Sequence, residues 1–153
     1  MILCGIDPGL TGALAFLDGR KLVELSDMPV AIARKHEIDV LGLVSMLSQH
    51  AFNCQAIVER QQAMPKQGVT SSFRNGSSYG ALLAVLAVQG WPVTIVSPRE
   101  WKQAMHCSSD KNQSLEVARR LFPGAAQSLT RKKDHGRAEA LLIAEYGRRK
   151  LGG

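Results

Sequence analysis

The chain has 153 residues, a length typical of a single domain spanning residues 1–153 and too short for two lobes. Its longest apolar run, residues 81–88, is far below the roughly 20 residues that cross a bilayer, which excludes a membrane-spanning helix. Lysine and arginine outnumber aspartate and glutamate by 19 to 13, and the resulting net charge of +6 favours a polyanionic partner such as nucleic acid.

The three cysteines, Cys4, Cys54 and Cys107, lie far apart and form no CxxC or Cys/His cluster. An odd number without metal-ligand spacing indicates small buried side chains in a reducing compartment. We therefore expect a soluble cytoplasmic protein with no membrane partner and no small-molecule cofactor.

The first half of the sequence predicts three antiparallel strands followed by a helix. Residues 2–6 are apolar without alternation, which is typical of a central strand covered on both faces. Gly9 and Gly12 predict a tight turn, and Asp18-Gly19 predicts a two-residue hairpin. The predicted elements are strands at 2–6, 13–17 and 21–26, a loop with a basic surface at 28–37, and a helix at 39–50.

The second half predicts two more strands and four helices. Ser97-Pro98-Arg99-Glu100 is a capping box with proline at the first helical position, so a short helix begins there. The predicted elements are a strand at 55–59, an exposed loop at 63–78, a buried alanine-rich helix at 79–89, a strand at 91–96, helices at 98–105 and 111–122, a linker at 125–130 and a helix at 136–150. This order predicts an α/β fold with a mixed five-stranded sheet, three antiparallel strands and then parallel ones, flanked by helices.

Two of the predicted strands end in an acid. Asp7 follows the first apolar run, and Glu59 follows the apolar run of the strand at 55–59. A helical crossover makes these strands parallel, so both carboxylates emerge at the same edge of the sheet, where open α/β sheets bind ligands. Asp134 and Glu139, at the start of the last helix, complete an acidic constellation.

Carboxylates so close together repel one another unless divalent cations lie between them. Oxygen ligands suit Mg²⁺ or Mn²⁺, and two such ions bind both the attacking water and the leaving oxygen of a phosphodiester. The pattern therefore indicates hydrolysis of a nucleic-acid backbone. Each acid also has a simpler interpretation: Asp7 as a turn residue, Glu59 as a partner of Arg60, Asp134 as a helix cap, and Glu139 as a surface partner of Arg137 or Lys132.

Three motifs in register resemble the RuvC-type Holliday junction resolvases, especially their compact phage versions, within the RNase H-like superfamily. They are GIDPGLTGALAF, AIVER and KKDHGRAEALLIAEYG, and SPREWKQ and SSDKNQSLEVARRLFP lie between them. The resemblance covers nearly the whole chain. It implies an RNase H-like fold and an Mg²⁺-dependent endonuclease, with two ions and Mn²⁺ as a substitute. It also implies a homodimer that resolves four-way junctions by paired nicks in a bacterial or phage-infected cell.

Asp7 and Glu59 match the first two metal-binding acids of this family, and Glu139 matches the last. The final motif departs from the family pattern, because Gly136 stands three residues before Glu139, where the family has an acid or a histidine. We expect Asp134 and Glu139 to be the remaining ligands. His135, on the same helical face as Glu139, is a further ligand, a group that orients or protonates the water or leaving oxygen, or a plain surface residue.

The resemblance also implies DNA contacts. Phe73 is a candidate for stacking on an exposed base, with anchoring of its own loop as the simpler interpretation. The helix at 79–89 is a candidate dimer interface, with burial inside the monomer as the alternative. Candidate phosphate contacts are Lys66, Arg74, Lys111, Arg131, Lys132 and Lys133.

Three other functions remain open from the sequence. An ATPase of the actin and sugar-kinase type also opens on a strand with an acid and glycines, but its two lobes exceed this length. A catalytically silent junction-binding protein is favoured if the altered spacing around Gly136 removes the metal site. A nuclease of the same fold acting on RNA or on other branched DNA is the third.

Overall fold

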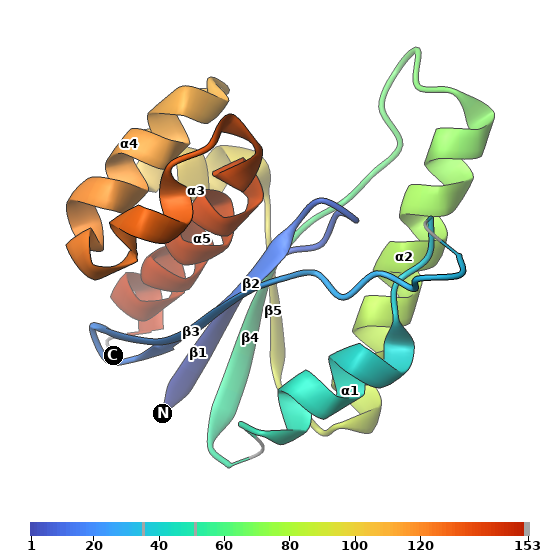
Figure 1. Cartoon of the computed structure of the whole chain (residues 1–153), viewed down its shortest axis with the longest axis horizontal. Helices are drawn as coiled ribbons and strands as arrows, with labels where there is room; N and C mark the ends of the chain where they lie inside the picture. Colours follow the sequence, from blue (N-terminus) through green and yellow to red (C-terminus); the bar gives the residue numbers. More distant parts are fainter. Residues whose placement is uncertain (35, 51, 152–153) are drawn as a thin grey trace.

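The computed structural model describes residues 1–34, 36–50 and 52–151 and contains one five-stranded sheet in the order β3-β2-β1-β4-β5 (Figure 1). Lys35, in the predicted basic loop, lies outside these residues. The strands are β1 (Ile2–Asp7), β2 (Ala13–Asp18), β3 (Lys21–Asp27), β4 (Cys54–Glu59) and β5 (Val93–Val96).

The central strand β1 pairs antiparallel with β2 and parallel with β4, and β4 pairs parallel with β5. In this register Ile6 is opposite Val58, so Asp7 and Glu59 are the next residues along their strands. The prediction of three antiparallel strands followed by parallel ones is confirmed.

Helices cover both faces of the sheet. α1 (Val40–Ser48) and α2 (Val69–Val88) lie on one face, and α3 (Pro98–Ala104), α4 (Lys111–Leu121) and α5 (His135–Leu151) lie on the other (Figure 1). A short 3₁₀ helix, Pro123–Leu129, occupies most of the predicted linker, and a second, Lys132–Asp134, leads into α5. No helix in the described ranges is long and apolar enough to span a membrane.

The close approach of α5 to β1 sets the position of the site. A Cβ atom on Gly5 would lie 2.2 Å from the carbonyl oxygen of Ala140, so only glycine allows this crossing. Strand side chains alternate between faces, and Asp7, two residues after Gly5, therefore also faces the α5 side. Ile57 belongs to the core on the α5 side, so the same alternation turns Glu59 toward α5.

The largest difference from the sequence prediction concerns residues 69–78. Their serine, asparagine and glycine content predicted an exposed loop. The exposure is confirmed for most of these residues, but the loop is wrong, because they form the first half of α2. Few side chains in this half are buried, whereas Leu82, Val85 and Leu86 of the second half are. The packed half provides the helix nucleus, and extending an existing helix costs much less than starting one.

Candidate metal-dependent active site

The two strand ends and the start of α5 meet at one edge of the sheet. Asp7 ends β1, Glu59 ends β4, and His135 and Glu139 lie in the first two turns of α5. Asp7, Glu59 and Glu139 are all buried, being 8%, 7% and 9% exposed respectively. Burying an unpaired carboxylate costs several kcal/mol, so three of them at one edge create a strong demand for positive charge.

Asp7, His135 and Glu139 form the centre of the site. Each contributes one potential ligand atom, and these atoms all lie within 4.8 Å of one another. The ring nitrogen Nδ1 of His135 is buried and has no hydrogen-bond partner among the described residues. Two carboxylates and an imidazole at this separation can ligate one divalent cation.

Gly136 explains why the last motif departs from the family pattern. A Cβ atom on Gly136 would lie 2.4 Å from the carbonyl oxygen of Thr11 and 3.1 Å from Cα of Gly12. The first turn of α5 thus contacts the turn between β1 and β2, and no side chain fits at this position. His135, one residue earlier, places its imidazole beside Asp7 instead.

The electrostatics of Asp7 show an uncompensated negative charge. Burial, followed by the charges of Glu139 and Glu59, raises the pKa of Asp7 to about 7, although the backbone N–H of Gly9 donates a hydrogen bond to it. A protein-bound cation would reverse this shift, because a nearby positive charge favours the ionised carboxylate.

Glu59 is held by a residue that the sequence reasoning missed. The indole Nε1 of Trp101 donates a 2.6 Å hydrogen bond to Oε2 of Glu59, and Trp101 is fully buried. Burial raises the pKa of Glu59, the Trp101 hydrogen bond opposes this, and the charge of Glu139 adds to it. Glu59 is outside the 4.8 Å group but interacts electrostatically with both of its acids.

Lys102 is a second residue of the site that the sequence reasoning missed. It forms an ion pair with Glu139. Its Nζ atom is 3.6 Å from Oε1 of Glu139 and 5.3 Å from the centre of the Trp101 ring. The signal was available in SPREWKQ, because the predicted capping box is present and fixes the start of α3 at the end of β5. From that start, Trp101 and Lys102 both reach the acids.

Asp134, predicted as a ligand, is placed elsewhere. Its carboxylate accepts hydrogen bonds from the backbone N–H and the guanidinium of Arg131, the shortest being 2.7 Å, and lies 3.7 Å from Nη1 of Arg137. Hydrogen bonds from Arg131 outweigh burial and hold the pKa of Asp134 below its usual range. Its charge is therefore compensated inside the 3₁₀ turn, and the geometry supports His135 rather than Asp134 beside Asp7.

The predicted DNA contacts are distributed around this edge. Lys66, Phe73 and Arg74 belong to the loop after β4 and to α2, and Phe73 is 76% exposed. Lys111 begins α4 and is close enough to His135 that its charge, after burial, lowers the pKa of that imidazole. Arg131 is bound to Asp134, while Lys132 and Lys133 are exposed.

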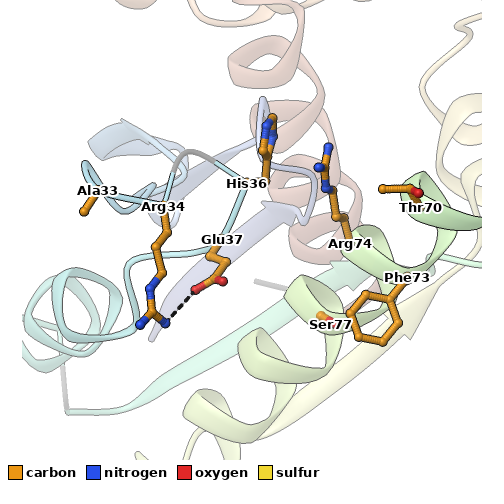
Figure 2. Close-up of a pocket in the computed structure, with 8 residues that line it drawn as sticks. All are labelled: Ala33, Arg34, His36, Glu37, Thr70, Phe73, Arg74 and Ser77. Carbon is orange, nitrogen blue, oxygen red and sulfur yellow. Dashed lines mark hydrogen bonds and ion pairs between the residues drawn. The ribbon is translucent and has the colours of Figure 1, made fainter.

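The largest cavity described is separate from the acids. It has a volume of about 640 Å³ and lies between residues 33, 34, 36 and 37 and the first half of α2, with Phe73, Arg74, Arg34 and His36 among its lining residues (Figure 2). Arg34 forms a 3.4 Å ion pair with Glu37 (Figure 2). Two predicted DNA contacts therefore line a basic cavity, and the chemistry lies elsewhere.

The residues present fit a divalent cation. Three potential ligand atoms converge, the buried Nδ1 atom of His135 lacks a partner, and the buried carboxylates exceed the nearby positive charge. The oxygen atoms suit Mg²⁺ or Mn²⁺, and the imidazole favours the softer Mn²⁺ of the two.

Comparison with known proteins agrees with this description. No family model matches the chain. A chloroplastic Holliday junction resolvase, MOC1 of Chlamydomonas reinhardtii, is 37% identical over 91 residues, which is 58% of this chain and 10% of that protein. The chain thus corresponds to about a tenth of the relative that it matches.

Solved structures show the same fold over nearly the whole chain. RuvC of Thermus thermophilus in complex with a Holliday junction substrate has a TM-score of 0.71 and 22% identity, covering 99% of this chain and 96% of that one. A second T. thermophilus RuvC structure has a TM-score of 0.70 and 19% identity, covering 99% and 97%. The predicted resemblance is therefore confirmed: the chain has the RNase H-like fold of RuvC, and its sequence is related to that of a Holliday junction resolvase.

Proposed function

We propose that the protein is a divalent-metal-dependent endonuclease that resolves four-way and other branched DNA junctions. The observation that carries this proposal is the convergence of Asp7, His135 and Glu139 within 4.8 Å, beside Glu59, at the carboxyl end of the central strands. The sequence relationship to a junction resolvase supports the substrate class.

The chain's own residues have distinct tasks in this reaction. Asp7, Glu59, Glu139 and His135 would hold Mg²⁺ or Mn²⁺, with two ions as the expected number. Such ions supply activation of water and stabilisation of the leaving oxygen in phosphodiester hydrolysis. Trp101 donates its indole N–H to Oε2 of Glu59 and so fixes the orientation of that carboxylate.

Lys102 and Lys111 contribute positive charge on the side of α3 and α4. Lys102 offsets only part of the negative charge of the buried acids, and a phosphate group entering the site would offer its ammonium a second anionic partner. Burial, followed by the charge of Lys111, lowers the pKa of His135, which favours the neutral imidazole that binds metals.

Incubation with synthetic four-way junctions, flaps, duplexes and RNA hybrids, with Mg²⁺, Mn²⁺ or EDTA, tests this function. We expect paired nicks in the four-way junction that require the metal. Asp7→Asn should abolish cleavage while junction binding persists. Unchanged cleavage by Asp7→Asn would refute the metal site, and cleavage of RNA or flaps alone would assign another substrate.

We further propose that the active form is a homodimer joined through α2. α2 buries Leu82, Val85 and Leu86 within the monomer, but its opposite side exposes Gly76, Gly80 and Val88. A Cβ atom on either glycine would meet nothing within 4 Å, so a second helix has room to approach closely. Sedimentation of the protein and of Gly80→Leu tests this; a wild-type monomer would refute it.

A further inference from the structure

A groove begins at Glu59 and extends away from the acids. It has a volume of about 470 Å³, within the range of roughly 300 to 1,000 Å³ typical of ligand sites. One wall is the segment that follows β4, and the other is the start of α3. Its lining includes Glu59, Arg60, Gln61, Gln62, Met64 and Arg99.

The backbone fixes the two walls at their bases. The N–H of Arg60 donates a 2.7 Å hydrogen bond to the carbonyl oxygen of Val96, which joins the end of β4 to the end of β5. Ser97 and Glu100 exchange the two hydrogen bonds of a capping box, at 2.9 and 3.2 Å. Arg99, between these two residues, therefore projects from a fixed first turn of α3.

The groove carries two exposed guanidinium groups. Arg60 and Arg99 are exposed, and neither forms an ion pair in residues 52–151. Glu100, next to Arg99 in sequence, accepts a hydrogen bond from the backbone N–H of Ser97, and the charge of Arg60 acts on its carboxylate only weakly beside that bond. Two exposed guanidinium groups beside a carboxylate cluster suit phosphate oxygens on either side of a reacting phosphodiester.

The remaining lining groups suit a base. Gln61 and Gln62 carry amides that both donate and accept hydrogen bonds, the pairing that reads base edges. Met64 is 60% exposed and offers a flexible apolar side chain for packing against a base. The groove thus combines phosphate-binding cations, edge-reading amides and an apolar surface, starting at a residue of the active site.

We propose that this groove binds the DNA nucleotide next to the scissile phosphate. Arg60 and Arg99 contact the backbone, and Gln61 and Gln62 contact the base edge and set the sequence preference at the cut. This inference rests on the proposed function, since it presupposes a DNA strand at the acids.

Two double variants and a charge-matched control test it. Arg60→Gln/Arg99→Gln should lower the slope of log binding constant against log salt by about 0.7 to 0.9 for each lost contact. Arg20→Gln/Lys21→Gln removes the same charge from the β2–β3 hairpin, at the opposite end of β1, and should change the slope much less. Equal slopes for the two variants would overturn the phosphate contacts.

Gln61→Ala/Gln62→Ala is read by sequencing the cut sites in junctions with randomised bases around the crossover. The wild-type preference at the flanking base should fall by about tenfold, since one base contact is worth roughly 1 to 3 kcal/mol. The proposed base contact would be overturned if the double variant kept the wild-type base preference, or if the wild-type enzyme showed no base preference at the cut. If wild-type protein cleaves no branched DNA, the proposed function fails, whereas cleavage with unaffected groove variants overturns the groove alone.

Discussion

Glu139 and Glu145 are buried acids on the same helix, and they differ in what surrounds them. Glu145, 6% exposed, accepts three hydrogen bonds from Arg148 and Arg149 at 2.7 to 2.8 Å. Glu139, 9% exposed, has Lys102 at 3.6 Å and the carboxylate of Asp7 nearby. The far end of α5 compensates its buried charge with protein groups, whereas the near end leaves it for an added cation.

This contrast separates structural from functional acids without reference to conservation. Asp134 belongs to the first class, because Arg131 and Arg137 surround its carboxylate. Asp7, Glu59 and Glu139 belong to the second. Replacing an acid of the first class should therefore lower the stability of the protein, whereas replacing an acid of the second class should lower its activity.

The largest effect is expected at Glu139. Glu139→Gln removes a proposed metal ligand and should lower the single-turnover rate of junction cleavage at least about 100-fold, since even groups that only orient ligands contribute 10- to 100-fold. Asp134→Asn should remain close to the wild-type rate. Full activity of Glu139→Gln, or an equal loss in Asp134→Asn, would contradict the division between the two classes of acid.

Trp101→Phe tests whether the orientation of Glu59 matters. Removing the indole donor should weaken Mn²⁺ binding, measured by calorimetry without DNA, by about 10- to 100-fold. Trp91→Phe is the matched control, because Trp91 is also buried and its Nε1 has no partner among the described residues. Equal Mn²⁺ affinity in both variants would show that Trp101 only fills the core.

Glu145→Gln should lower the free energy of unfolding by about 2 kcal/mol, because it removes the charge-assisted hydrogen bonds that the buried carboxylate accepts from Arg148 and Arg149. Hydrogen bonds from Arg148 and Arg149 outweigh burial and hold the pKa of Glu145 low. Its stabilisation is therefore present above the usual glutamate pKa and is lost as pH falls through the lowered value. Urea unfolding between pH 2 and 7 measures this. A cleavage rate that fell with intact folding would place Glu145 in the site instead.

The pH dependence of the metal-free protein should show the reverse sign at Asp7. The pKa of Asp7 is raised to about 7, so the neutral acid stabilises the fold, and this stabilisation is lost as pH rises from about 4 to 7. Asp7→Asn should remove this loss and raise the free energy of unfolding in EDTA at pH 8 by up to about 4 kcal/mol, because each unit of pKa shift corresponds to about 1.4 kcal/mol. Parallel stability curves for Asp7→Asn and the wild type would contradict a raised pKa.

The sequence alone determined the order of the strands and the two acids of the sheet. Apolar runs ending in Asp7 and Glu59, on strands joined by a helical crossover, leave little freedom in where those carboxylates emerge. Local chemistry likewise determined the start of α3, because the capping box involves only neighbouring residues. The composition of residues 69–78 wrongly predicted a loop, because the helix there extends a segment that is held by packing further along the chain.

Only the tertiary structure decided which residues of the last motif join the site. Spacing along a helix leaves Asp134, His135 and Glu139 within reach, and the choice depends on the contact of Gly136 with Thr11 and on the capture of Asp134 by Arg131. Trp101 and Lys102 likewise meet the acids only when α3 packs beside α5. These are contacts between segments far apart in the chain, and local sequence patterns do not encode the distances between them.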